Sequence, residues 1–247
     1  MASTIFLHGP TFAGDAPKTQ TFDSNGVSIS YTVEGKGEPV VLIHGLYASA
    51  QVNWRAPGII RLLATNYQVI ALDVRGHGAS GKPTKESDYG VEMAEDIVRL
   101  LDHLKIKQAH LVGYSMGGMI TMKILTRHPD RVKSAVLGGM GWMREGGTLQ
   151  NVWGRARERE GSVPPTACIR SFGALAVREQ EIKAIKVPTA VLIGENDPIR
   201  QLYVEPLEVI RPDWPVTIVP AAGHLACVIM PEFKAGIKKW LDEQPKN

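Results

Sequence analysis

Apolar and polar residues alternate near the start of the chain. Residues 19–22 and 27–33 follow this period-two pattern, and Ser24, Asn25 and Gly26 separate them. Alternation marks a half-buried strand, and Asn-Gly is the dipeptide that tight hairpin turns prefer. We therefore predict a β-hairpin here.

Further along, the apolar positions form short continuous runs separated by stretches of helical spacing. A continuous run suits a strand that is buried on both faces, so these runs predict a mainly parallel sheet with helices on both sides. The predicted strands cover residues 39–43, 67–73, 108–112, 135–137, 189–193 and 216–219, and the predicted helices cover residues 51–65, 90–104, 117–125 and 231–241.

This rhythm stops between residues 141 and 180, where we predict a short helical insert over the edge of the sheet. Residues 155–160 alternate in charge, which is typical of a solvated helix face. The pattern divides the chain into a loose tail (1–18), a core (19–140 and 181–247) and a reduced cap or lid (141–180).

Composition narrows the possible classes of protein. The 247 residues are 44% hydrophobic and 21% charged with a formal net charge of +3, which fits a globular protein and gives no sign of nucleic-acid binding. No apolar run approaches the roughly 18 residues of a membrane span. Because the first residues lack a basic signal-peptide region, we expect a soluble, cytoplasmic protein. Cys168 and Cys227 have no zinc-type spacing, nor do the histidines, so we expect no metal.

The chemistry centres on residues 113–117, which read G-Y-S-M-G. In this pattern a sharp turn between a strand and a helix exposes the serine, here Ser115, and its neighbours must be small. The residues before it form a predicted buried strand and those after it a predicted helix, as the motif requires.

Two more polar residues follow predicted strands, Asp197 and His224. A serine hydroxyl needs an imidazole to take its proton, and the imidazole needs a carboxylate to fix its tautomer. We predict Ser115 as nucleophile, His224 as general base and Asp197 as the orienting acid. Asp73 also follows a strand and is the alternative carboxylate, although the R-G-H-G sequence after it favours a structural turn.

Attack on an acyl carbon produces an oxyanion that two backbone N–H groups can stabilise. Met116 follows the nucleophile at the start of a helix, and Leu46 follows His44 and Gly45 after another strand. We predict that their N–H groups form the oxyanion hole and that His44 supports this loop.

With these motifs in order, the chain resembles the α/β-hydrolase superfamily, in the branch of small esterases, lactonases and C–C bond hydrolases. The resemblance runs from about residue 20 to the C-terminus, and it implies an α/β fold with a mostly parallel eight-stranded sheet and the roles given above. Two departures are the short insert and Ile229, which stands near where relatives commonly carry a glutamate. The matching motifs lie at residues 44–46, 73–80, 113–118, 194–198 and 223–224.

We expect a cofactor-independent serine hydrolase acting on the carboxylic ester of a small-molecule acyl substrate. A C–C hydrolase, lactonase or hydroxynitrile lyase is the alternative within enzymes, and a small-molecule receptor is the alternative outside them. No oligomeric state is predicted. Apolar residues near the post-strand loops are expected to line the substrate pocket; they are Tyr47, Met140, Trp142, Met143, Trp153, Phe172 and Leu225.

Overall fold

A computed structural model of the protein describes residues 17–147 and 150–245, and these residues form one eight-stranded sheet. The strands lie in the order β1-β2-β4-β3-β5-β6-β7-β8. They are β1 (Gln20–Ser24), β2 (Val27–Glu34), β3 (Glu38–Ile43), β4 (Tyr67–Leu72), β5 (Ala109–Tyr114), β6 (Val132–Gly138), β7 (Thr189–Gly194) and β8 (Val216–Val219).

The two ends of the sheet differ in strand direction. β1 pairs antiparallel with β2 and β2 with β4, whereas the remaining pairs are parallel. Asn25 (φ 56°) and Gly26 (φ 81°) both have positive φ, as a type I′ hairpin turn requires. The predicted hairpin and the mostly parallel sheet are confirmed.

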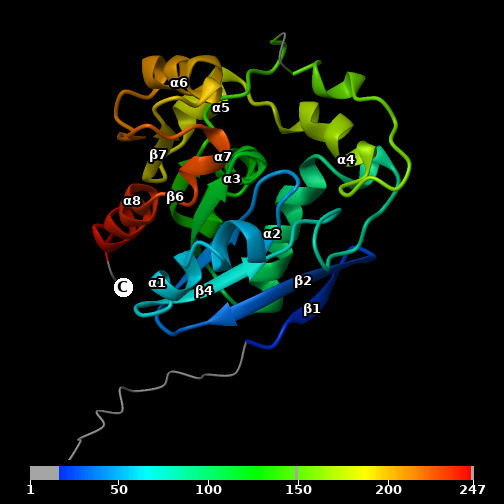
Figure 1. The fold of residues 1–247 in the computed structure, drawn as a ribbon, viewed down its shortest axis with the longest axis horizontal. Helices are drawn as coiled ribbons and strands as arrows, with labels where there is room; N and C mark the ends of the chain where they lie inside the picture. The colour runs from blue at the N-terminus through cyan, green and yellow to red at the C-terminus, as the bar shows by residue number, and fades with distance from the viewer. Residues whose placement is uncertain (1–16, 148–149, 246–247) are drawn as a thin grey trace, which may run out of the picture.

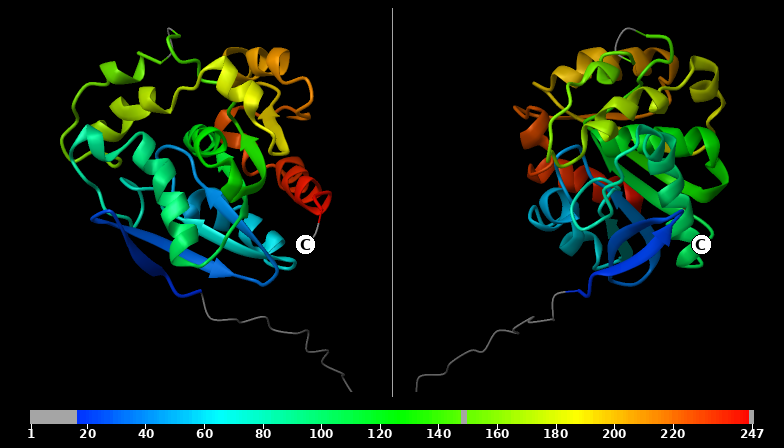
Figure 2. Two further views of the ribbon diagram at one scale, coloured as in Figure 1. Left: turned by 180° about the vertical axis from the view of Figure 1, so that it is seen from behind. Right: turned by 90° about the vertical axis from the view of Figure 1, so that its right-hand side faces the viewer.

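Helices cover both faces of the sheet (Figures 1 and 2). α2 (Val91–His103) and α3 (Met116–Arg127) pack into one apolar cluster with one face, and α1 (Ile59–Leu63) and α8 (Pro231–Asp242) pack into a second cluster with the other. β3, β5 and β7 contain no exposed residue because both faces are covered, whereas the edge strand β8 has two exposed residues. The short helices are α4 (Thr166–Arg170), α5 (Glu179–Ala184), α6 (Glu205–Ile210) and α7 (His224–Cys227).

Two predicted helices are wrong in extent or kind. The single helix expected over residues 51–65 is a π-helical turn, Gln51–Arg55, followed by α1, because Gly58 adopts a left-handed backbone (φ 81°) between them. The charged run at 155–160 is exposed as predicted but is not helical: a 3₁₀ turn, Trp153–Arg155, ends where the run begins.

The two stems of the insert are bonded to each other, and Lys123 bonds one of them to the core. Trp142 Nε1 donates to the carbonyl of Val177 (2.9 Å), and Val177 N–H donates to the carbonyl of Met143 (3.0 Å). Lys123 of α3 adds a bond to the carbonyl of Ala176 (2.7 Å). In Figure 1 the segment between these stems, green to yellow, runs across the top of the molecule. We propose residues 141–180 as the cap; residues 1–16 of the predicted tail lie outside the described residues.

Candidate active site

The turn after β5 holds Ser115 in an uncommon backbone conformation, φ 53° and ψ −113°. Its N–H donates to the carbonyl of Gly138 (2.7 Å), which fixes the turn to the end of β6. A Cβ on Gly117 would overlap the carbonyl oxygen of Ile43, so the strained turn depends on a bare backbone at that position. Such strain persists only where the surrounding structure enforces it, and it often marks a functional site.

His224 joins Ser115 and Asp197 in a chain of hydrogen bonds. Its Nε2 lies 2.9 Å from Ser115 Oγ, and its Nδ1 lies 2.7 Å from Asp197 Oδ2. Asp197 follows β7 and its side chain is fully buried, whereas the His224 side chain is 25% exposed at the start of α7. The structure therefore brings together the three residues predicted from the sequence.

The two candidate carboxylates have different partners. Asp197 Oδ1 accepts the N–H of Ile199 (2.9 Å), which leaves Oδ2 directed at His224. Asp73 accepts the N–H groups of Ala50 (2.9 Å) and Ala79 (2.8 Å), one on each oxygen. Asp73 is therefore engaged by nearby backbone, as its turn sequence suggested.

His44 orients the loop that carries Leu46. Its Nε2 accepts the N–H of Val74 (3.0 Å), so the proton must be on Nδ1, which donates to the carbonyl of Gly45 (2.8 Å). In a trans peptide the N–H of Leu46 points away from that carbonyl, so the same bond fixes the direction of the Leu46 N–H. A Cβ on Gly45 would lie only 3.3 Å from Ser115 Cβ, which places this loop beside the nucleophile.

Met116 supplies the second predicted N–H. It is the first residue of α3, where the N–H has no acceptor within its own helix. Among the described residues neither this N–H nor that of Leu46 has a hydrogen-bond acceptor. Two free donors beside a serine can receive a negatively charged oxygen.

Two histidines beneath the site are held neutral. His44 and His77 are buried with their rings 5.1 Å apart, and burial lowers the pKa of both, that of His77 to about 3. A neutral His44 is required for the bonds described above. His44 holds the loop through these bonds, and His77 packs edge-on against the His44 ring.

The seven predicted pocket residues fall into three groups by exposure. Tyr47 and Leu225 are 63% and 87% exposed and lie close in sequence to Leu46 and His224. Trp153 is partly buried against the ring of Phe172, 5.4 Å away. The other four, Met140, Trp142, Met143 and Phe172, are buried in the core cluster. A role in substrate binding stays a prediction for all seven.

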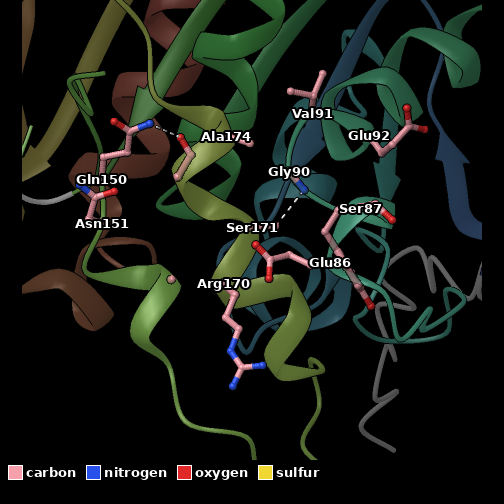
Figure 3. Close-up of a pocket in the computed structure, with 13 residues that line it drawn as sticks. Glu86, Ser87, Gly90, Val91, Glu92, Gln150, Asn151, Arg170, Ser171 and Ala174 are labelled. Atoms are coloured by element: carbon pink, nitrogen blue, oxygen red, sulfur yellow. Dashed lines mark hydrogen bonds between the residues drawn. The ribbon is translucent and has the colours of Figure 1, made fainter. Parts of the chain in front are cut away.

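A cavity of about 590 Å³ lies between the insert and the start of α2 (Figure 3). The hydroxyl of Ser171 accepts the N–H of Gly90 (2.9 Å) across it, while Arg170 and Gln150 line the insert side. Ser115, Asp197 and His224 are absent from its lining. The cavity is therefore separate from the hydrogen-bonded Ser115, His224 and Asp197 side chains.

Within residues 17–147 and 150–245, no group of His, Cys, Asp or Glu could hold a metal ion. In the same part of the chain no helix is both long and apolar enough to cross a bilayer.

Sequence reasoning missed two residues of the site. Asn53 Oδ1 accepts the N–H of Gly45 (2.8 Å) and so holds the loop before Leu46. Tyr114, directly before Ser115, stacks on the ring of His224 and donates a hydrogen bond to its backbone carbonyl. Asn53 stands in a segment of mixed polar and apolar residues, Gln51–Arg55, so the sequence pattern indicates neither Asn53 nor Tyr114.

The fold and this arrangement define an α/β hydrolase. Residues 38–160 match the family model described as "alpha/beta hydrolase fold". The chain belongs to this family.

Relatives within the family differ in the reactions that their names describe. One is 35% identical over 171 residues, the dihydrolipoyllysine-residue acetyltransferase component of an acetoin cleaving system from Pseudomonas putida; the match covers 67% of this chain but only 44% of that protein. Another, 2-hydroxy-6-oxo-6-(2'-aminophenyl)hexa-2,4-dienoic acid hydrolase from Metapseudomonas resinovorans, is 28% identical over 85% of this chain and 86% of its own.

A meta-cleavage product hydrolase from Pseudomonas fluorescens shares the fold. Its structure superposes with a TM-score of 0.72 at 22% identity, covering 91% of this chain and 97% of that one.

Proposed function

We propose that the protein is a serine hydrolase that cleaves a carboxylic ester of a small molecule through an acyl-enzyme. The observation that carries this proposal is the chain from Ser115 Oγ through His224 to the buried Asp197, with distances of 2.9 and 2.7 Å. The fully buried carboxylate favours the tautomer in which His224 Nε2 accepts the serine proton.

The proposed reaction has two stages. Ser115 Oγ attacks the ester carbonyl while His224 takes its proton, and the N–H groups of Leu46 and Met116 bind the oxyanion. The tetrahedral intermediate collapses, and His224 gives the proton to the departing alcohol. Water, activated by the same histidine, then hydrolyses the acyl-enzyme.

Turnover of short p-nitrophenyl esters tests this proposal. We expect repeated turnover by the wild-type protein and a loss of about 10⁴-fold or more in Ser115→Ala, because the nucleophile is removed. An unchanged rate in Ser115→Ala would overturn the proposal. A panel of esters of increasing acyl length would then define the substrate class.

A C–C bond hydrolase is the second candidate, and the names of two of the similar proteins favour it. A 2-hydroxy-6-oxohexa-2,4-dienoate is the matching probe. Cleavage of this compound at a higher kcat/KM than any ester of the panel would replace the ester assignment. Loss of both activities in Ser115→Ala would place both reactions at the same serine.

A further inference from the structure

Tyr114 connects the nucleophile to the general base by a route outside the Ser-His-Asp chain. It is the last residue of β5, directly before Ser115, and it is only 3% exposed. Its ring stacks on that of His224 with centroids 5.6 Å apart and 29° between planes. Its hydroxyl donates a hydrogen bond to the backbone carbonyl of His224.

The segment that carries His224 has little regular structure of its own. α7 is four residues long, and Gly223 before it provides no side-chain cap. Leu225, the next residue, is 87% exposed. The bond from Tyr114 therefore supplies support from the buried side that the short helix lacks.

The Tyr114 ring is itself fixed on two sides. Phe233 of α8 packs edge-on against it, with centroids 5.4 Å apart and 89° between planes. Gly139 lies so close that a Cβ there would come within 2.9 Å of Tyr114 Cζ and 3.1 Å of its hydroxyl. A ring enclosed in this way can hold another group at a defined distance.

We propose that Tyr114 is a positioning residue that sets the placement of His224 relative to Ser115. It can do so because it is covalently joined to Ser115 and hydrogen-bonded to the His224 backbone. This inference rests on the proposed serine-hydrolase function.

The same contact suits the charge that His224 gains when it takes the serine proton. The face of an aromatic ring carries partial negative charge, and Tyr114 stacks this face against the His224 ring. Burial raises the pKa of Tyr114, so its hydroxyl stays protonated and remains a donor.

Tyr114→Phe removes the hydroxyl and keeps the ring. We expect kcat to fall about fivefold to tenfold, the consequence of losing one hydrogen bond that aligns the base, with KM within about twofold. Labelling of Ser115 by a fluorophosphonate should slow by the same factor. The downfield proton resonance of His224 Nδ1–H should broaden as the ring gains freedom.

Tyr89→Phe is the matched control. Tyr89 is also 3% exposed, and its hydroxyl also donates to a backbone carbonyl, that of Pro83 (2.7 Å). This variant should lose similar stability and keep the wild-type kcat and labelling rate. Equal kcat and labelling rates in Tyr114→Phe and the wild type would overturn the inference, as would an equal loss of kcat in both variants.

If Tyr114→Phe does not fold, Gly139→Ala tests the same contact from the other side. The added methyl displaces the Tyr114 ring, so kcat should fall at least fivefold, about what one hydrogen bond supplies. Gly26→Ala controls for strain, since Gly26 also has positive φ (81°) but open space around it, and its kcat should be unchanged. Wild-type kcat in Gly139→Ala would contradict the inference.

The two proposals fail in different ways. Wild-type protein that neither hydrolyses esters nor reacts with the fluorophosphonate would refute the serine-hydrolase proposal. The His224 Nδ1–H resonance would still report on positioning, and an identical resonance in Tyr114→Phe and the wild type would refute the role of Tyr114.

Discussion

The turn at Ser115 and the insert at residues 141–180 differ in how closely their backbones pack. At the turn, a Cβ on Gly113 would overlap the carbonyl of Gly117, and one on Gly117 would overlap that of Ile43. In the insert, Gly154 has nothing within 4 Å of the same position. Close packing at the turn excludes a side chain at Gly113 and Gly117, whereas the insert has space for a side chain at Gly154. This difference fits a division in which the turn would carry the chemistry and the insert would select the substrate.

The largest effect is expected at Asp197. Asp197→Asn should lower kcat by about 10⁴-fold, because the amide favours the wrong tautomer of His224. Asp73→Asn should cost at most about tenfold in kcat, since Asp73 bonds only backbone N–H groups that position loops. Steady-state kinetics on one ester decides between them, and the reverse ranking would make Asp73 the working carboxylate.

Gly117→Ala tests the tight packing at the turn. We expect a loss of about 4 kcal/mol or more in the free energy of unfolding, because backbone atoms rather than a flexible side chain block the methyl. Gly154→Ala should stay within about 0.5 kcal/mol of the wild type. Urea titration of both variants measures this, and similar losses would remove the contrast between the two regions.

The neutral histidines beneath the site should make stability depend on pH. In the unfolded chain His77 has the ordinary histidine pKa of about 6.5, whereas in the folded protein its pKa is about 3. As pH falls from about 6.5 toward 3, the unfolded state binds a proton that the folded state excludes. The free energy of unfolding therefore falls by about 1.4 kcal/mol per pH unit for this one group.

His77→Asn should flatten that dependence by about one proton, because asparagine does not titrate. Urea titrations at pH values from 7 to 4 provide the slope for each protein. Equal slopes of unfolding free energy against pH in the wild type and His77→Asn would contradict the prediction, because His77 would then bind its proton in the folded state as well.

The smallest effect is expected in the charged run of the insert. The Arg157 side chain is exposed, so Arg157→Gln should change the free energy of unfolding by no more than about 0.5 kcal/mol. Its kcat for short esters should equal that of the wild type. A large fall in kcat/KM would instead place this run in substrate binding and weaken the view of it as a solvated surface.

Local pattern predicted the elements best where packing is densest. The strands 39–43, 67–73 and 189–193 were expected from their apolar runs and appear as β3, β4 and β7. Pattern failed over residues 51–65, where Gly58 interrupts the helix, and over the charged run, which lacks the apolar face that would hold a helix against the core. In both places a local turn prevailed over helical spacing.

The sequence by itself determined the succession of strands along the chain, the sharp turn at Ser115, and the positions of Asp197 and His224 after their strands. Those features follow from the periodicity of apolar residues and from the glycines beside Ser115, and both signals extend over only a few residues. Tertiary structure decided the rest: that Asp197 rather than Asp73 reaches His224, and that the Tyr114 hydroxyl donates to the backbone of a residue 110 positions away. Such contacts depend on how segments that are far apart in sequence pack together, and a pattern of a few residues does not encode that packing.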